Sequence, residues 1–527
     1  MHSYRNPILP GFYPDPSLCR VGRDFYLVTS SFEYFPGVPI FTSKDLVNWK
    51  QIGHVLDRPS QLDLDNSPCS RGIWAPTIRF HDGVFYMCTT NMLRKPRGES
   101  DVGGHFIVTA TDPAGPWSEP YRLDDAPGID PSLFFDDDGK AYFMATCYPH
   151  QGSQYKGNNE IWCREMDIQE MRLIGERYYL WQGALDGAAL HTEAPHIYTI
   201  NGWYYLMVAE GGTGYKHSVT IARSKSVTGP YENNPRNPLI THRNMGNNYP
   251  ITNVGHADLV QTQNGEWWMV LLGSRPYGGL FRNLGRETFL VRVVWENGWP
   301  IVSPGCGRVE FEHAVPDLEP HPWNRVYSRD NFDAERLDFC WNFLRTPRES
   351  FWSLSERTGC LRLKLRPEKL SECVNPSFIG RRQQHMNFSA SCAIEFDPAR
   401  EFETAGLVLL QNNNFHFRLE VGFRDGRRIV MLTKREAGDE QVLSCKEIDS
   451  TILVLTASAR GQEYGFYYGS DETAKIPLAE KVDGRVLSTE IAGGFTGIYI
   501  GMYASSNGAQ SGNHADFHWF EYRGEEG

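Results

Sequence analysis

A short phrase that recurs five times between residues 15 and 260 is the feature of this sequence that most constrains its fold. The copies are Asp15-Pro16-Ser17-Leu18, Ala75-Pro76-Thr77-Ile78, Asp130-Pro131-Ser132-Leu133, Ala194-Pro195-His196-Ile197 and, more loosely, His256-Ala257-Asp258-Leu259. Their starts lie about 55–64 residues apart, a supersecondary period somewhat longer than the usual propeller blade. The period indicates an architecture in which similar units pack against one another.

Each copy continues through a turn into an apolar, aromatic stretch. Asp82-Gly83 precedes Phe85-Tyr86-Met87, for example, and Asn264-Gly265 precedes Trp267-Trp268-Met269-Val270. Asp-Gly and Asn-Gly pairs tolerate the positive φ of tight hairpin turns, so each copy opens with a β-hairpin. A second turn signal in most copies adds two outer strands, and such a four-stranded unit is stabilised by packing around an axis. We predict a five-bladed β-propeller over residues 1–314.

The repeat also brings three acidic residues to equivalent positions. Asp15 and Asp130 share one repeat position, and Glu193 lies one residue earlier in its copy, as Trp74 does in the second copy. The first strand of each blade lines the central channel, so these side chains should face one cavity. A single Asp before Pro more often caps a turn. Three acids in one cavity repel one another and raise at least one pKa, which structure alone does not require.

Two carboxyls with separated pKa values beside aromatic rings suit the hydrolysis of a glycosidic bond. Longer runs then resemble a known family, the two-domain β-xylosidases of glycoside hydrolase family 43. The runs span residues 6–17 and 30–40, and include Thr192-Glu193-Ala194-Pro195-His196, Ala209-Glu210-Gly211-Gly212-Thr213 and Gly285-Arg286-Glu287-Thr288. The sequence departs from the family at Ala194, where many relatives have Gly, and in a shorter 275–285 loop, which leaves the preferred sugar open.

The resemblance implies a role for each acid. Asp15 resembles the general base that activates water, Glu193 the general acid, and Asp130 the carboxylate that raises the pKa of the acid and orients it. Such enzymes invert the anomeric centre, with base and acid separated by about 6.5–9.5 Å so that water fits between them. No cofactor is required.

The resemblance also assigns residues that line the sugar pocket. Phe32, Trp74 and Arg286 match family positions around the terminal sugar, although by themselves they read as core aromatics and a surface ion-pair residue. His256 matches a histidine at the channel centre, where it would bind substrate and where some members hold a calcium ion largely through waters. A lone histidine is more often a hydrogen-bonded core residue, and calcium prefers oxygen ligands, so calcium in the channel is the less favoured reading.

The repeat ends near residue 315. A Pro-rich passage begins there, and we expect a linker over residues 315–328. Downstream, stretches such as residues 360–365 alternate apolar and polar side chains, which predicts an antiparallel β-sandwich over residues 329–527. In the family this domain contributes a loop to the active site, and Phe495 matches its aromatic residue, the alternative being that Phe495 is sandwich core.

Composition limits the partners and the setting. A net charge of −12 argues against nucleic-acid and anionic-membrane partners. No signal-like start and no membrane-span-length apolar run is present, and the eleven cysteines lack paired spacing. Together these features favour a cytoplasmic protein with reduced thiols. The family resemblance implies a homo-oligomer, a dimer or a tetramer.

Three functional hypotheses follow. The first is an exo-acting, inverting β-xylosidase that releases xylose from the non-reducing end of short β-1,4-xylooligosaccharides and also has α-L-arabinofuranosidase activity. The second is an enzyme that acts mainly on α-L-arabinofuranosides, with arabinosylated oligosaccharides as substrates. The third is a non-catalytic carbohydrate-binding protein on the same scaffold.

Overall fold

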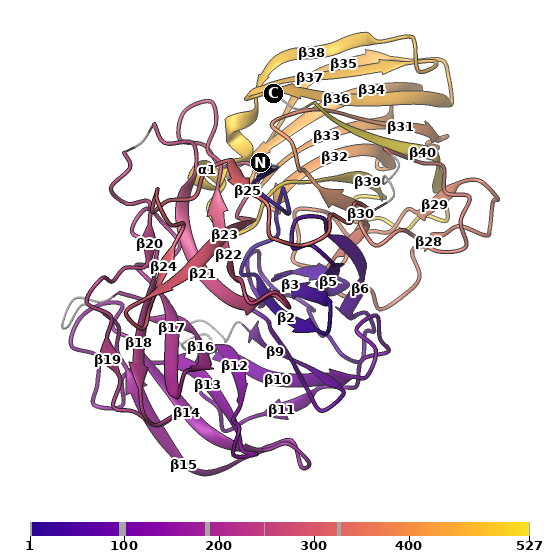
Figure 1. The fold of residues 1–527 in the computed structure, drawn as a ribbon. Coiled ribbons are helices and arrows are strands. Elements are labelled where there is room, and N and C mark those ends of the chain that lie inside the picture. Colours follow the sequence, from indigo (N-terminus) through magenta and orange to yellow (C-terminus); the bar gives the residue numbers. More distant parts are fainter. Residues whose placement is uncertain (1–2, 94–101, 185–189, 247, 324–327, 526–527) are drawn as a thin grey trace.

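The computed structural model describes residues 3–93, 102–184, 190–246, 248–323 and 328–525, which are almost entirely antiparallel β-structure. Five small sheets surround an axis, and two larger sheets pack face to face beside them (Figure 1). The predicted fold, a five-bladed propeller followed by a β-sandwich, is confirmed. In the described residues, no helix is long and apolar enough to cross a membrane.

The blades follow one another along the chain, and in each the strand that includes residues of the repeated phrase is innermost. The first has β2 (Ser17–Val21), β3 (Asp24–Val28), β5 (Gly37–Ser43) and β6 (Lys50–Leu56). The second has β7 (Gly72–Ile73), β8 (Thr77–His81), β9 (Val84–Leu93), β10 (Val102–Ala110) and β11 (Tyr121–Leu123). The third has β12 (Ile129–Phe135), β13 (Ala141–Cys147), β14 (Glu160–Asp167) and β15 (Arg172–Trp181).

Two further blades complete the ring. The fourth has β16 (Glu193–Ile200), β17 (Trp203–Glu210), β18 (Ser218–Ser224), β19 (Glu232–Asn233) and β20 (Ile240–Thr241). The fifth has β21 (Thr252–Gln261), β22 (Trp267–Ser274), β23 (Glu287–Glu296) and β24 (Trp299–Val302). The N-terminal β1 (Ser3–Arg5) pairs with β25 (Glu312–Ala314), and the Asn6 side chain makes hydrogen bonds in both directions with the backbone of Leu290. The chain start is thereby fastened to the last blade.

The repeated phrase has one backbone conformation in four of its five copies. Asp15, Asp130, Ala194 and His256 have φ of 56°, 55°, 54° and 47°. These values are left-handed, a conformation that costs a residue other than Gly about 1–2 kcal/mol. In the third, fourth and fifth blades the pairing register shifts at this point, as in a β-bulge. Bulges re-aim side chains, so the repeat turns these residues toward the axis.

The sandwich contains two eight-stranded sheets. One comprises β26 (Arg329–Asp330), β28 (Trp352–Ser353), β29 (Leu361–Lys364), β31 (Asn387–Glu395), β36 (Ile452–Arg460), β37 (Glu463–Gly469), β38 (Ile476–Asp483) and β40 (His514–Glu525). The other comprises β4 (Tyr34–Phe35), β27 (Asn342–Leu344), β30 (Ser377–Arg382), β32 (Thr404–Asn412), β33 (Phe415–Arg424), β34 (Arg427–Glu436), β35 (Asp439–Glu447) and β39 (Tyr499–Ser505). Two short helices, η1 (Gly484–Leu487) and α1 (Thr489–Ala492), precede β39.

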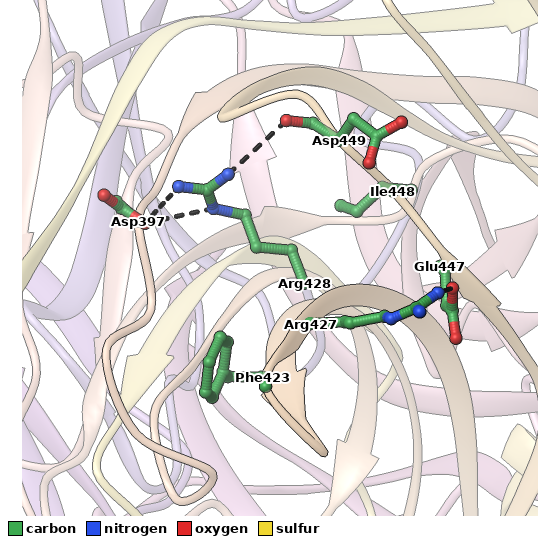
Figure 2. Close-up of a pocket in the computed structure, with 8 residues that line it drawn as sticks. Asp397, Phe423, Arg427, Arg428, Glu447, Ile448 and Asp449 are labelled. Carbon is green, nitrogen blue, oxygen red and sulfur yellow. Dashed lines mark hydrogen bonds and ion pairs between the residues drawn. The ribbon is translucent and has the colours of Figure 1, made fainter.

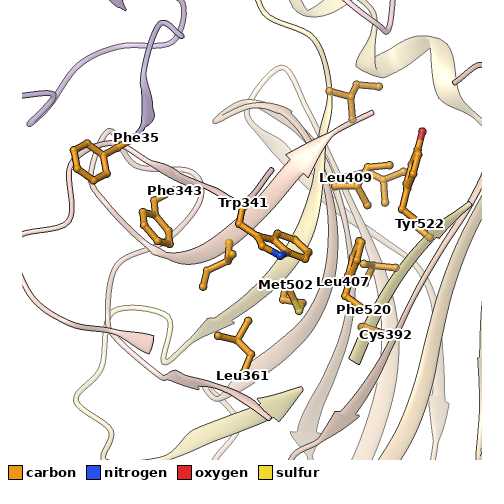
Figure 3. Packing of buried hydrophobic residues seen from close by; sticks show 14 of the residues in the cluster. Phe35, Trp341, Phe343, Leu361, Cys392, Leu407, Leu409, Met502, Phe520 and Tyr522 are labelled. Atoms are coloured by element: carbon orange, nitrogen blue, oxygen red, sulfur yellow. The ribbon is translucent and has the colours of Figure 1, made fainter. Parts of the chain in front are cut away.

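One of these strands comes from the propeller. Although β4 belongs to the connection between β3 and β5 of the first blade, it pairs with β27, with Phe35 opposite Phe343. Apolar side chains of both sandwich sheets, among them Leu361, Leu407 and Phe520, form a cluster that continues to Phe35 (Figure 3). The same cluster includes residues of the first two blades. The two domains therefore share one apolar core.

Candidate active site

Asp15 lies at the mouth of the channel, two residues before the start of β2, and its carboxylate accepts three hydrogen bonds from two side chains. Arg286 donates from Nη1 to Oδ1 at 2.7 Å and from Nη2 to Oδ2 at 3.2 Å, and Ser30 Oγ donates to Oδ2 at 2.6 Å. Burial alone would raise the pKa of Asp15. The Arg286 charge, His256 and the Ser30 hydroxyl outweigh that effect, so the pKa lies below its usual value. Asp15 is therefore a carboxylate at neutral pH.

The pKa values of Glu193 and Asp130 are shifted upward, opposite to that of Asp15. Burial raises the pKa of Glu193 well above its ordinary value, and the negative charges of Asp130 and Asp15 raise it further. The pKa of Asp130 is also raised, first by burial and then by Asp15, while the Arg286 charge and a hydrogen bond from the Ala194 backbone N–H oppose the shift in part. These two carboxyls influence each other, and like charges in one buried site cannot both ionise cheaply. The pair therefore retains a proton that Asp15 has lost.

Aromatic rings from both domains form a wall beside these carboxyls. Phe32 has its ring centroid 6.4 Å from that of Trp74 and 6.2 Å from that of Phe495. The rings of Trp74 and Phe495 meet edge to face at 6.0 Å with an interplanar angle of 80°. The Arg286 guanidinium carbon lies 5.7 Å from the centre of the Phe32 ring and 5.8 Å from that of Phe495. Phe32 is buried, whereas Trp74 and Phe495 are half-buried.

The wall joins a small cavity between the domains. Its volume is about 90 Å³, and its lining includes Arg286 and Phe495 together with Thr213 and Ser274. The propeller segment next to it touches the sandwich closely, since a Cβ on Gly285 would lie 2.9 Å from the backbone nitrogen of Gly497. Phe495 thus faces the site from the sandwich.

A larger cavity, of about 350 Å³, lies at the end of the sandwich. Figure 2 shows that its arginines are engaged by acidic neighbours. Arg428 donates to the Asp397 carboxylate and to the backbone oxygen of Asp449, and Arg427 forms an ion pair with Glu447. With these charges paired, the arrangement shows no group poised for chemistry.

His256 lies beside Asp15, with Nδ1 3.7 Å from Asp15 Oδ1. Burial lowers the pKa of His256, and the Asp15 charge opposes this shift only in part, so the imidazole is neutral at neutral pH. A calcium ion at His256 would need oxygen ligands, yet both oxygens of Asp15 already accept hydrogen bonds. Among the described residues, no group of three or more His, Cys, Asp or Glu side chains is placed to hold a metal ion. The residues do not fit a directly held calcium ion, and we derive no step through one.

Deeper in the channel, a polar network joins all five blades around the buried carboxylate of Asp258. It receives hydrogen bonds from Arg79 Nη1 at 2.8 Å, from Ser17 Oγ at 2.7 Å and from Tyr198 Oη at 2.6 Å. Arg79 Nη2 also lies 2.8 Å from Nδ1 of His196, which Ser132 Oγ approaches to 3.1 Å. The axis is thus filled by paired polar groups. This network supports the segments that carry Asp15, Asp130 and Glu193.

The structure brings together every predicted site residue, namely Asp15, Asp130, Glu193, Phe32, Trp74, Arg286, His256 and Phe495. Sequence reasoning assigned no role to two neighbours of Asp15. Ser30 lies in the run of residues 30–40, and only its position two residues before Phe32 could have indicated a role in the site. His217 is buried with Nδ1 2.9 Å from the backbone oxygen of Asn253, and burial lowers its pKa to about 3 although the Asp15 charge opposes the shift in part. His217 follows the Glu210-Gly211-Gly212-Thr213 run and belongs to no copy of the repeated phrase.

Carboxyls with opposed pKa shifts at the mouth of a propeller axis, walled by aromatic rings, define a glycoside hydrolase. The profile described as "Glycosyl hydrolases family 43" matches residues 4–300, and that described as "Beta xylosidase C-terminal Concanavalin A-like domain" matches residues 329–523. The chain belongs to glycoside hydrolase family 43, and the resemblance seen in the sequence is confirmed.

Similar proteins match along nearly the whole chain. A "Xylosidase/arabinosidase" of Butyrivibrio fibrisolvens is 48% identical over 98% of this chain and 98% of its own. A "Non-reducing end alpha-L-arabinofuranosidase" of Bacteroides ovatus is 44% identical over 99% of this chain and 95% of its own. The crystal structure of a xylan beta-1,4-xylosidase from Bacillus halodurans, 35% identical, superposes with a TM-score of 0.93 over 99% of this chain and 100% of that one.

Proposed function

We propose that this enzyme is an exo-acting, inverting β-xylosidase that removes xylose from the non-reducing end of short β-1,4-xylooligosaccharides and also cleaves α-L-arabinofuranosides. The observation that carries the proposal is the opposed ionisation of Asp15 and Glu193 at one channel mouth. A carboxylate that stays ionised suits a general base, and a carboxyl that keeps its proton suits a general acid.

The proposed reaction is a single displacement. As a water molecule attacks the anomeric carbon, Asp15 accepts a proton from it, and the water oxygen forms the new bond to the sugar. Glu193 gives its proton to the glycosidic oxygen while the bond from that oxygen to the anomeric carbon breaks, so the shortened oligosaccharide leaves as an alcohol. Asp130 keeps the pKa of Glu193 high through its negative charge. The product has the inverted configuration, and no covalent sugar intermediate forms.

The wall of aromatic rings supports cleavage at chain ends. Phe32 and Trp74 of the propeller and Phe495 of the sandwich meet on one side of the acids. Flat rings exclude water and pack against the face of a sugar ring, so a site closed on this side favours a single terminal residue over the middle of a long chain. Arg286 lies against two of these rings, and we infer that it also binds sugar hydroxyls.

Two activities are proposed because the relatives carry both names. The Butyrivibrio protein is called a xylosidase/arabinosidase, the Bacteroides protein an arabinofuranosidase and the Bacillus structure a xylosidase. The two non-reducing pentoses present similar hydroxyl patterns to a small pocket. The ratio of kcat/KM on the aryl β-xyloside and the aryl α-L-arabinofuranoside decides which activity dominates. Membership of a hydrolase family favours both enzyme hypotheses over a non-catalytic binding protein.

Proton NMR of xylobiose during digestion tests the proposal. We expect α-xylose to appear first and to convert slowly to the equilibrium mixture of anomers, and we expect Asp15→Ala to abolish the reaction. If β-xylose appears first, the inverting mechanism is wrong although the substrate is right. If wild-type enzyme cleaves neither xylobiose nor an aryl arabinofuranoside, the proposed function fails.

The proposal extends to the setting of the enzyme. All eleven cysteines are free thiols, which supports a reducing, cytoplasmic environment. There the enzyme would act on oligosaccharides after their import. A dimer or tetramer remains our prediction for the oligomeric state, and size-exclusion chromatography with light scattering measures it directly.

A further inference from the structure

Ser70 lies in the connection between β6 and β7, next to the aromatic wall. Its side chain is buried, and its φ of 62° is left-handed. Such a conformation costs a serine about 1–2 kcal/mol and is kept where the surroundings compensate for it. All three polar groups of Ser70, its backbone N–H, its backbone oxygen and its hydroxyl, are used in hydrogen bonds that lead to the pocket.

Each of these hydrogen bonds reaches a different part of the wall. The backbone N–H donates to the carboxylate of Glu33 at 2.9 Å, and Glu33 directly follows Phe32 in the chain. The backbone oxygen accepts from Trp74 Nε1 at 3.1 Å. The hydroxyl oxygen accepts from the backbone N–H of Phe495 at 2.9 Å, a bond that crosses from the propeller to the sandwich.

The sandwich loop is shaped for this contact. A Cβ on Gly494 would lie 2.5 Å from Ser70 Oγ, and Gly494 has a φ of 82°. Only glycine permits both the backbone angle and the close approach. The loop is held farther along as well, because Gln411 donates from Nε2 to the backbone oxygen of Thr496 at 2.9 Å. Phe495 is therefore fixed on both sides, and Ser70 supplies the attachment to the propeller.

We propose that Ser70 is a positioning residue that sets the spacing of the pocket rings Trp74 and Phe495, and thereby the affinity for the terminal sugar. The inference rests on the proposed function, since it concerns how the same pocket holds its pentose. Ser70 itself need not touch the sugar. Its hydroxyl fixes Phe495, which the sandwich contributes to the wall, and its backbone oxygen fixes the indole of Trp74.

Ser70→Gly is the variant that isolates the hydroxyl. Glycine suits a φ of 62° and keeps the backbone bonds to Glu33 and Trp74, so only the link to Phe495 is lost. One hydrogen bond contributes about 0.5–1.5 kcal/mol, which corresponds to an increase of about 2–12-fold in KM for the aryl β-xyloside. We expect kcat to change little, because the ring contacts hold ground state and transition state alike. The melting temperature should not fall.

Ser67→Ala is the matched control. Ser67 stands in the same connection, and its buried hydroxyl has no hydrogen-bond partner among the described residues. Removing that hydroxyl should leave KM, kcat and the melting temperature unchanged. If Ser67→Ala raised KM as much as Ser70→Gly does, the effect would reflect a general loosening of the β6–β7 connection. That result would overturn the proposal.

A double-mutant cycle with Phe495→Ala provides the second test. Once the Phe495 ring is absent, fixing the backbone at position 495 no longer positions a ring against the sugar. Ser70→Gly should therefore have little further effect on KM in the Phe495→Ala background. Fully additive effects on KM would contradict a role through Phe495. Wild-type enzyme that cleaves neither glycoside would instead refute the proposed function. A wild-type enzyme that is active and indistinguishable from Ser70→Gly refutes only the positioning role.

Discussion

The propeller and the sandwich are both antiparallel β-structures, yet their centres are filled in opposite ways. The propeller axis holds the ion pair of Arg79 with Asp258, and Asp15 with Arg286 lies at its mouth. The space between the sandwich sheets is filled by apolar side chains such as Leu407 and Met502 (Figure 3). Strands arranged around an axis bring polar strand ends together, whereas facing sheets bring together the apolar faces of whole strands.

This difference teaches which domain performs which part of the function. Buried charges persist only when they are paired, and they change pKa values in their surroundings. The propeller therefore provides the proposed acid and the proposed base. The sandwich contributes enclosure, through Phe495 and the loop that carries it. We expect changes on the axis to affect kcat or the stability of the fold, and changes at the domain boundary to affect substrate affinity or the response to pH.

The largest effect is expected at the acid. Glu193→Gln keeps the shape of the side chain but cannot donate a proton to the leaving oxygen, so kcat on xylobiose should fall by about 10²–10⁴-fold. An aryl glycoside with a good leaving group needs less protonation and should lose less. Asp138→Asn makes a comparable change at an exposed hairpin turn and should leave kcat intact. Equal losses on both substrates would contradict the assignment of Glu193 as the general acid.

The second prediction concerns how much the ion pair of Arg79 with Asp258 on the axis stabilises the propeller. Arg79→Met leaves the buried Asp258 carboxylate without its cation, and breaking a buried pair in this way costs about 3–5 kcal/mol of unfolding free energy. Urea denaturation of the full chain measures the change. Arg236→Met removes an exposed pair with Glu296 and should cost at most about 1 kcal/mol. Similar losses in the two variants would mean that the axial pair supports the propeller no more than a surface pair does.

At the boundary between the domains, stability should depend on pH through Glu33. Burial raises the pKa of Glu33 to about 7, and Arg345 of the sandwich opposes the shift only in part. The other titratable neighbours, Tyr34, Cys69 and Tyr499, have raised pKa values and stay neutral below about pH 8. The folded state holds a proton that the unfolded chain has lost, so this contribution is complete below about pH 4.5 and disappears as the pH rises through about 7.

Glu33→Gln tests that dependence. The shift of the pKa from 4.5 to about 7 corresponds to about 3 kcal/mol. Between pH 5 and pH 8 the unfolding free energy of the wild type should fall by about that amount relative to the variant. Glu119→Gln, at a carboxylate whose pKa is lowered by hydrogen bonds from Arg58, should not reproduce the change. If the unfolding free energies of wild type and Glu33→Gln ran parallel with pH, Glu33 would have the same pKa in the folded and the unfolded state.

The smallest effect is expected at the modulating carboxyl. Asp130→Asn removes a negative charge that raises the pKa of Glu193, so the alkaline limb of the pH profile of kcat/KM should move to lower pH. We expect a loss of about tenfold at pH 8 and a smaller loss at pH 5. The acid limb, which depends on Asp15, should move little. A uniform loss across the pH range would indicate that Asp130 only orients its neighbours.

The repeat made much of the propeller predictable, because each copy carries the same local signals for a hairpin. The places of Asp15, Asp130 and Glu193 followed from spacing alone, and the family resemblance added their roles. Contacts between distant segments left no such trace. Ser70 reaches Phe495 across 425 positions, and no spacing or periodicity marks either partner in advance.

The sandwich was predictable as a class but not in its strand order. Alternating stretches indicate strands, yet nothing local shows that β40, the last strand, pairs with both β29 and β31. The recruitment of β4 was also hidden, because Tyr34 and Phe35 lie within a run that reads as ordinary propeller sequence. Backbone pairing over such distances depends on how two finished domains fit together, which no window of sequence contains.

The exchange of β4 has a practical consequence for anyone who wishes to dissect or recombine this enzyme. Excising the second half would expose the backbone of β4 and, with it, the segment that bears Phe32 and Glu33. Grafting a foreign C-terminal module would demand a replacement that accepts the same short strand. We therefore expect a single cooperative melting transition for the intact polypeptide, and we expect chimaeras to survive only when the crossover point keeps both partners of that strand together.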